Sequence, residues 1–220
     1  MRVITDDKSK INELFVRLNR SKPLTGAEIR NAMTGPVPEI IRVLVMRDMF
    51  KSCIRFPVKR GQDKNAAAKL LLFEHAEKMT ETKRRNLDLF TEEARRATKN
   101  KLELASRRVV DTLDRMSGIF LPRDLLLAAA GTLPVYYWFI RQRKLKEDAY
   151  IREFLVHFER GRKANRATAP GGSPTRAQNA ELVEYDEFNR NTNDIRSHEG
   201  RVRILEKHFA HYMRTTKTKS

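Results

Sequence analysis

An apolar residue recurs every three to four positions through most of this chain, and this period constrains the fold more than any other feature. Ile11, Leu14, Phe15 and Leu18 are the first example, because their spacing places all four on one face of a helix. No segment shows the sustained alternation of apolar and polar residues that half-buried strands require. The sequence therefore predicts an all-α fold, a multi-helix bundle with at most one short strand at residues 3–5.

Residues that start and stop helices divide the chain into segments. Thr25 and Glu28 form a capping-box pattern, in which each side chain accepts a backbone N–H of the other residue. Gly35 and Pro36 then end the short helix that follows. A long polar helix is expected over 91–116, with the apolar positions from Ala94 to Met116 on one face. Further helices are expected over 37–50, 66–79, 124–130, 135–145, 148–161, 177–189 and 196–213, with a loop over 56–65 and a connection rich in Pro and Gly over 168–174.

Length and composition fit one folded unit with an appendage. The chain has 220 residues, of which 40% are apolar and 33% charged, so it can bury a core beneath a heavily ionised surface. We expect four parts, which are an N-terminal segment at 1–35, a helical domain at 36–165, a flexible loop at 166–176 and C-terminal helices at 177–220 that pack on the helical domain.

Cysteine usage and the apolar runs point to the cytoplasm. Cys53 is the single cysteine, which excludes an internal disulfide and a thiolate metal cage. No secretory signal pattern follows Met1. The most apolar stretch, Leu125–Ile140, is shorter than the roughly 20 residues that span a bilayer and contains Gly131 and Pro134. We interpret it as two buried core helices that meet at 131–134, and we expect no membrane partner.

The charge of the chain points to a polyanionic partner. The formal net charge is +17, so nucleic acid or an anionic membrane surface is the first partner to consider, with DNA favoured. A solvated basic surface without a specific ligand is the alternative. The basic clusters predict these nucleic-acid-binding candidates: Lys83, Arg84, Arg85, Arg95, Arg96, Arg141, Arg143, Lys144, Arg162 and Lys163.

Motifs for catalysis, metal binding and cofactor binding are missing from the sequence. It contains no phosphate loop, dinucleotide fingerprint or nucleophile elbow. His208 and His211 share a helix face but have no convincing third ligand. The acidic pairs at 111 and 114 and at 184–187 are explained better by ion pairing along a helix than by a metal site. The aromatic block at 136–139 is explained better by core packing than by base stacking. We expect no catalytic residue, no metal and no cofactor for this chain alone.

Three stretches near the N-terminus resemble a known family. Residues 11–19 (INELFVRLN), 22–25 (KPLT) and 28–32 (EIRNA) are similar to a segment of the domain of unknown function 262. This is the ParB-like N-terminal domain of GmrSD-type restriction endonucleases, which cut modified DNA. Residues 184–188 (EYDEF) and 201–205 (RVRIL) resemble the closing helices of such proteins. The resemblance is sharp over residues 3–35 and diffuse over the rest of the chain.

The resemblance implies a role near nucleotides. Members use a ParB-like fold that binds or hydrolyses nucleotides in phage defence, often joined to an HNH nuclease domain. Carried over to this chain, Phe15 and Asn19 would lie at the edge of a nucleotide pocket, with Arg17 as a weaker contact. Asn19 is equally well explained as a helix C-cap. The family's Asp-Gly-Gln-Gln-Arg motif does not occur in this sequence, so its catalytic role is not carried over.

Three hypotheses for function follow. The first is a truncated or split relative of this family, a helical nucleic-acid-associated module of restriction and phage defence. Such a module is not catalytic alone, and a separate chain that carries the missing motif would complete it. The second is an autonomous DNA- or RNA-binding protein. The third is a protein-interaction subunit that binds no nucleic acid.

Overall fold

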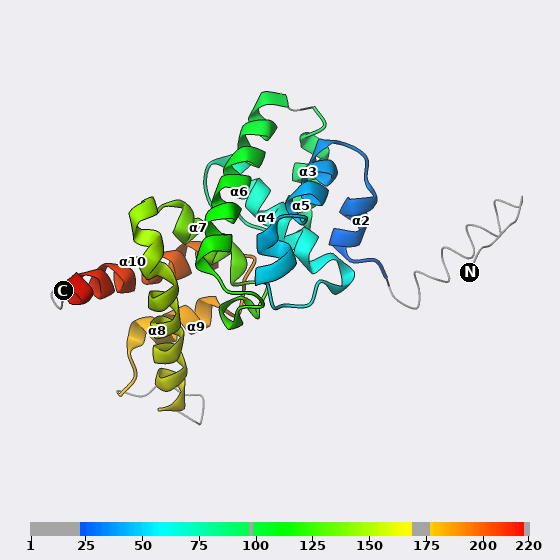
Figure 1. Ribbon diagram of the computed structural model, residues 1–220. Coiled ribbons are helices and arrows are strands. Elements are labelled where there is room, and N and C mark those ends of the chain that lie inside the picture. The colour runs from blue at the N-terminus through cyan, green and yellow to red at the C-terminus, as the bar shows by residue number, and fades with distance from the viewer. Residues whose placement is uncertain (1–22, 97–98, 169–176, 218–220) are drawn as a thin grey trace, which may run out of the picture.

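The computed structural model describes residues 23–96, 99–168 and 177–217 and shows only helices, turns and loops within them, which confirms the all-α prediction. Figure 1 shows α2, α3 and α5 at one end, α8 and α9 at the other, and α6 and α7 between them. The α-helices are α2 (Gly26–Ala32), α3 (Pro36–Leu44), α4 (Gln62–Ala76), α5 (Arg84–Glu93), α6 (Lys99–Ile119), α7 (Leu133–Arg141), α8 (Asp148–Ala167), α9 (Ala180–Phe188) and α10 (Ile195–Lys217). Shorter helical turns are η1 (Met49–Cys53), η2 (Lys59–Gly61), η3 (Leu125–Leu127) and η4 (Leu145–Glu147).

The predicted capping box opens α2. The backbone N–H of Glu28 donates to Thr25 Oγ1 at 3.2 Å, and the N–H of Thr25 donates to a Glu28 carboxylate oxygen at 2.7 Å. This bond favours the ionised form of the carboxylate, so it lowers the pKa of Glu28. Gly35 has a φ of 124°, which favours glycine, and Pro36 occupies the first turn of α3. The signals that predicted both ends of α2 are confirmed.

Two predicted helices are shorter or divided. The helix expected over 37–50 ends at Leu44, because the buried stripe of Val37, Ile41 and Leu44 would next reach Asp48, which is exposed. The helix expected over 91–116 was wrong at its start. Its first residues belong to α5, and α6 begins at Lys99. Arg95 and Lys99 are four positions apart in the sequence, and like charges at this spacing repel along a helix.

The helix expected over 124–130 is a single turn, η3. The carbonyl of Leu127 accepts the backbone N–H groups of Arg55 and Phe56 at 3.1 Å each, so the chain bonds outward instead of continuing a helix. The helices expected at 66–79 and 148–161 are present as α4 and α8, which begin at Gln62 and extend to Ala167, respectively. α4 thus takes over the end of the segment expected as a loop over 56–65.

One continuous core joins the helices. α7 lies at its centre, in contact with α4, α6 and α10. Tyr136, Tyr137 and Phe139 are fully buried, and Trp138 is nearly so, which confirms core packing for the aromatic block. The α6 face that was predicted from Leu102 to Met116 is also buried. Within the described ranges, no helix is both long and apolar enough to cross a bilayer.

A glycine sets how closely α9 and α10 approach. A Cβ atom at Gly200 would overlap the ring of Phe188, so only glycine fits at this crossing. α9 also contacts α8, which fixes the position of α8 relative to the body of the molecule. The expected strand at 3–5, the helix around 11–18 and most of the connection at 168–174 lie outside the described residues.

Candidate functional site

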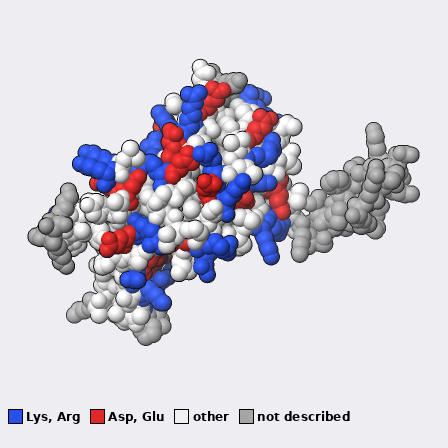
Figure 2. Space-filling view, viewed as in Figure 1, with Lys and Arg blue, Asp and Glu red and all other residues white. Residues whose placement is uncertain are grey.

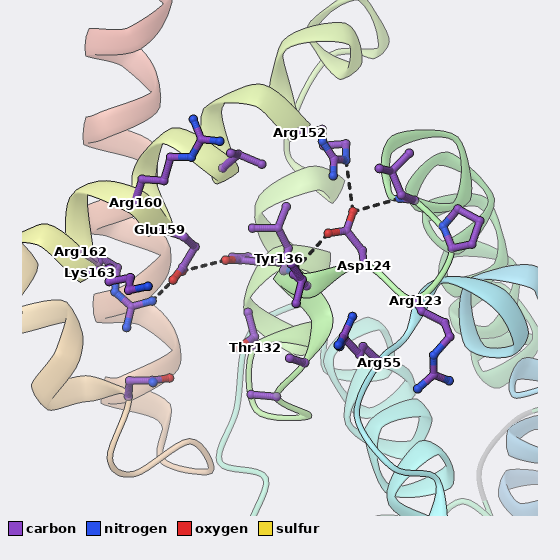
Figure 3. A pocket seen from close by; sticks show the side chains of 18 of the residues that line it. Arg55, Arg123, Asp124, Thr132, Tyr136, Arg152, Glu159, Arg160, Arg162 and Lys163 are labelled. Carbon is purple, nitrogen blue, oxygen red and sulfur yellow. Dashed lines mark hydrogen bonds and ion pairs between the residues drawn. The ribbon is translucent and has the colours of Figure 1, made fainter.

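A groove of about 820 Å³ lies between α8 and the segment that joins α6 to α7. Figure 3 shows this groove from close by, with α8 on one side and Arg55 and Arg123 on the other. Its floor includes Thr132 and Tyr136. The walls therefore come from three parts of the chain that are far apart in sequence.

The groove has a large excess of positive charge. Its acidic residues are Asp124 and Glu159. Its basic residues are Arg55, Arg123, Arg152, Arg160, Arg162, Lys163 and Arg166. Because seven cations line it against two carboxylates, the site attracts anions and repels cations.

Three of these cations are bound within the protein. Arg152 Nε lies 3.2 Å from a carboxylate oxygen of Asp124. Arg162 pairs with Glu159 at 2.6 Å and also with Asp186, which in turn lies 3.6 Å from Arg166 Nε. These three arginines take up both carboxylates of the groove, so they leave none for the remaining four cations.

Arg55, Arg123, Arg160 and Lys163, here called the groove cations, are exposed. Among the described residues, none of the four side chains makes an ion pair or a hydrogen bond. Arg160 and Lys163 belong to α8, and Arg55 and Arg123 lie across the groove (Figure 3). Each groove cation can therefore bind an anion without first breaking an internal contact.

A network of backbone bonds fixes the wall opposite α8. The N–H of Arg123 donates to the carbonyl of Ser52 at 2.7 Å, and the N–H of Asp124 donates to that of Cys53 at 2.9 Å. The buried carboxylate of Asp124 accepts the N–H groups of Leu121 and Leu126 at 3.0 and 3.1 Å. The loop that carries Arg123 is consequently held in one conformation.

Arg123 has a left-handed backbone, with a φ of 49°. This conformation costs roughly 1–2 kcal/mol for a residue with a Cβ atom. The other non-glycine residues with positive φ in the described ranges are Arg60 and Glu77, and their side chains pair with Glu28 and Arg108. Arg123 has no such contact, so internal interactions do not explain why an arginine stands here rather than a glycine.

The floor of the groove is a rigid, buried network. Tyr136 is fully buried, burial raises the pKa of its hydroxyl well above 10, and the hydroxyl donates to Glu159 at 3.0 Å. Burial disfavours the charged form of Arg162, but Glu159 and Asp186 hold its pKa above the ordinary value. Its guanidinium also lies 4.4 Å from the ring centre of Tyr185. Tyr136 and Arg162 therefore keep their protons at neutral pH and support the groove.

Of the basic residues predicted as binding candidates, Arg162 and Lys163 line this groove. Lys83 pairs with Glu81 and Asp194 at 2.7 and 2.8 Å, and Arg84 lies 3.4 Å from Asp88. Arg95 donates to the carbonyl of Thr34 at 3.1 Å. Acidic side chains are interspersed among the cations over the face that Figure 2 shows. Many of the basic side chains are thus paired with acidic or carbonyl groups within the fold.

Two further candidates are part of the fold. Arg141 pairs with the buried Glu74 and stacks over Trp138 at 4.7 Å. Arg143 pairs with Glu206 at 2.8 Å and stacks over Phe139 at 4.7 Å. The other candidates, Arg85, Arg96 and Lys144, are exposed and lie outside the groove. Phe15, Arg17 and Asn19, which were carried over from the family resemblance, lie outside the described residues.

The sequence candidates did not include Arg55, Arg123, Arg152, Arg160 or Arg166, although Arg160 and Arg166 belong to the same basic cluster as Arg162 and Lys163. Arg55 and Arg123 are isolated in loops and belong to no basic run, so no local signal marks them. Arg152 could have been found, because it lies one, two and three turns before Val156, Glu159 and Lys163 on one face of α8.

The acidic and histidine pairs show no metal geometry. Asp114 of α6 pairs at 2.5 Å with Arg47 in the turn after α3, and Glu184 of α9 pairs at 2.7 Å with Arg203 of α10. Ion pairing thus explains both carboxylates, but the pairs join separate segments and do not run along one helix as predicted. His208 lies 3.2 Å from Glu181. In the part of the chain that the structure describes, no cluster of three or more His, Cys, Asp or Glu side chains could hold a metal ion. Cys53 is buried, which raises its pKa and makes its thiol a poor nucleophile.

Comparison of the chain with family models, curated proteins and solved structures finds no match. The resemblance to the domain of unknown function 262 therefore stays a prediction from the sequence. Among the described residues, the groove with its unpaired cations is the feature that indicates a function.

Proposed function

We propose that this chain binds nucleic acid, and that the phosphate backbone lies in the groove between α8 and the loop of Arg123. The observation that carries the proposal is the set of groove cations, which have no partner among the described residues and lie on opposite sides of the groove. A fold gains nothing by holding four like charges in one recess. A polyanion removes this repulsion when it binds.

A phosphate backbone fits this arrangement better than isolated anions do. Successive phosphates repeat along a strand, so one strand can contact cations on both sides of an open groove. Each phosphate that a Lys or Arg neutralises releases a condensed counterion, which makes binding favourable at low salt. A flat membrane surface could reach the exposed rim, but its headgroups could not enter the recess from both sides.

The experiment compares two variants with the same net charge. In the first, Arg55, Arg123, Arg160 and Lys163 are all replaced by Gln. In the second, Gln replaces Arg85, Arg96, Lys101 and Arg107, four exposed cations outside the groove. Binding of a labelled oligonucleotide of roughly 16 nucleotides is measured by fluorescence anisotropy at low salt.

We expect the groove variant to bind at least about tenfold more weakly than the parent, because up to four phosphate contacts are lost. The control variant should lose only the small, non-specific effect of lower net charge. Equal losses in the two variants would contradict the proposal, since net charge alone would then explain binding. No loss in the groove variant would contradict it as well.

The family resemblance gives this binding a biological setting within the same proposal. As a relative of GmrSD-type restriction enzymes, the chain would be a DNA-binding, non-catalytic module of phage defence. A separate chain with the Asp-Gly-Gln-Gln-Arg motif would supply nucleotide hydrolysis. Nucleotide hydrolysis and DNA cleavage assays on this chain alone test the idea, and activity in either assay would contradict a non-catalytic module.

A further inference from the structure

We infer that the groove takes a single strand of nucleic acid in preference to a duplex. This inference rests on the proposed function and names the class of ligand for the same site. It depends on the placement of the groove cations on the two sides of the groove, on exposed apolar side chains beside Arg123, and on the conformation of the loop that carries Arg123 and these apolar side chains.

The placement of the cations suits a narrow ligand. Arg160 and Lys163 on α8 lie on one side of a recess of about 820 Å³, and Arg55 and Arg123 lie on the other side (Figure 3). A duplex carries its phosphates on the outside of a wide cylinder, and proteins usually meet it with a convex element such as a helix inserted in the major groove. Here the cations of α8 line a concave site. A single strand can lie within it and meet cations from both walls.

The rim of the groove also offers apolar surface. Leu121 is 53% exposed and Leu125 is 73% exposed, and both line the groove beside Arg123. In a duplex the faces of the bases are covered by their neighbours. In a single strand they are free to pack on apolar side chains or on the plane of an arginine. Because Tyr136 is buried in the floor, these contacts must come from leucine and arginine.

The loop holds the side chains of Leu121, Arg123 and Leu125 in a fixed arrangement. Asp124, at its centre, is 4% exposed and accepts the N–H groups of Leu121 and Leu126. Arg123 is held in a left-handed conformation by its bond to Ser52. A loop that is already ordered loses little conformational entropy on binding. The exposed leucines are therefore part of a surface that is already formed before the ligand binds.

The test measures the affinity of the protein for a single strand and for a blunt duplex of the same length. The same two measurements are made on two leucine variants. In the first variant Leu121 and Leu125 are both replaced by Ser. The matched control is Leu145→Ser, since Leu145 is 70% exposed and lies outside the groove. All these side chains are exposed, so thermal unfolding should occur at the same temperature in each protein.

We expect the single strand to bind at least about tenfold more tightly than the duplex. The double leucine variant should weaken single-strand binding severalfold and leave both duplex binding and the salt dependence unchanged. The Leu145→Ser protein should bind like the parent. Equal affinity for the two forms, or equal effects of the leucine change on both, would overturn the inference.

The outcomes separate this inference from the proposed function. If the duplex binds as well as the single strand, and the groove-cation variant loses both, the inference fails and nucleic-acid binding stands. If the groove-cation variant binds both forms normally, the proposed function itself fails. Tighter binding of polyglutamate than of the oligonucleotide would overturn the inference in favour of an acidic peptide.

Discussion

Arg162 and Lys163 are neighbours in the sequence, yet they belong to two different regions of the molecule. Arg162 is 5% exposed, pairs with Glu159 and Asp186, and stacks on Tyr185. Lys163 is exposed in the groove and has no ion pair within the described ranges. The comparison teaches that a basic run does not identify a binding surface, because the internal partners of each cation decide whether it supports the fold or can hold a ligand.

Besides Arg162, the interior contains further positively charged side chains, and these donate hydrogen bonds mostly to neutral groups. Arg201 is fully buried and donates to the carbonyls of Ser197 and Gly131, both at 3.0 Å. Nearby, Lys69 donates to the amide oxygen of Asn193 at 2.7 Å, and burial lowers its pKa to about 8. These groups are satisfied within the fold, whereas the groove cations are not.

Two single substitutions on α8, one of an interior cation and one of a groove cation, should differ most in their effect on stability. Arg162→Ala leaves the carboxylates of Glu159 and Asp186 without their shared partner in a largely buried site. We expect it to lower the free energy of unfolding by about 3 kcal/mol. Arg160→Ala, two residues earlier and exposed, should change it by less than about 0.5 kcal/mol.

Urea denaturation followed by circular dichroism measures both values. Similar losses of stability in the two variants would show that Arg160 also supports the fold. The distinction between interior and groove cations on α8 would then be wrong.

The interior set also predicts how acid affects stability. Burial, together with the charges of Arg201 and Lys69, lowers the pKa of His198 to about 3, whereas unfolded histidine titrates near 6.5. Between these values the unfolded chain binds a proton that the folded chain does not. Stability therefore falls as the pH drops, by about 1 kcal/mol per pH unit from this residue.

The His198→Gln variant isolates this effect, because all other titrating groups are common to both proteins. Between about pH 6.5 and pH 4.5, the parent should lose about 2 kcal/mol more than the variant in urea denaturation. Parallel losses over this range would mean that His198 is protonated in the folded state and that the interior is more polar than its burial indicates.

Replacing Arg123 should have a smaller effect, which raises stability and weakens binding. Arg123→Gly relieves the left-handed backbone, so the free energy of unfolding should rise by roughly 0.5 kcal/mol. The same change removes a groove cation and should weaken oligonucleotide binding severalfold. Glu77→Gly, at a φ of 55°, is the matched control, which should relieve strain without affecting binding.

Thermal unfolding and fluorescence anisotropy on the same three proteins give both readouts. Loss of stability in Arg123→Gly would indicate that the side chain holds the loop, and its exposed position would then have a structural explanation. Unchanged binding would remove Arg123 from the site.

Local signals in the sequence predicted much of the fold. The capping box at Thr25 depends on residues three positions apart, and the face of α6 depends on spacings within one helix. The aromatic block of α7 points in all directions around a helix, so the sequence predicted core packing for it, and all four of its rings are buried. Such features need no knowledge of tertiary contacts.

The groove could not be predicted in this way. Its walls bring together Arg55, the loop of Arg123 and the face of α8, and the pairing that joins them begins where the carbonyl of Leu127 accepts bonds from Arg55 and Phe56. That same pairing ends the helix expected over 124–130. Likewise, the basic clusters predicted binding residues that are in fact paired. The partners of Arg141 and Arg143, for example, are Glu74 and Glu206, which lie on other helices and could not be assigned from the sequence.

The salt dependence of binding reports how many of the groove cations contact phosphates. For a single strand, the slope of log Kd against log salt concentration changes by about 0.7 for each phosphate contact. The variant in which Gln replaces all four groove cations should have a slope shallower than that of the parent by close to 3. A slope equal to that of the parent would show that these four side chains do not contact phosphates, and would contradict the account.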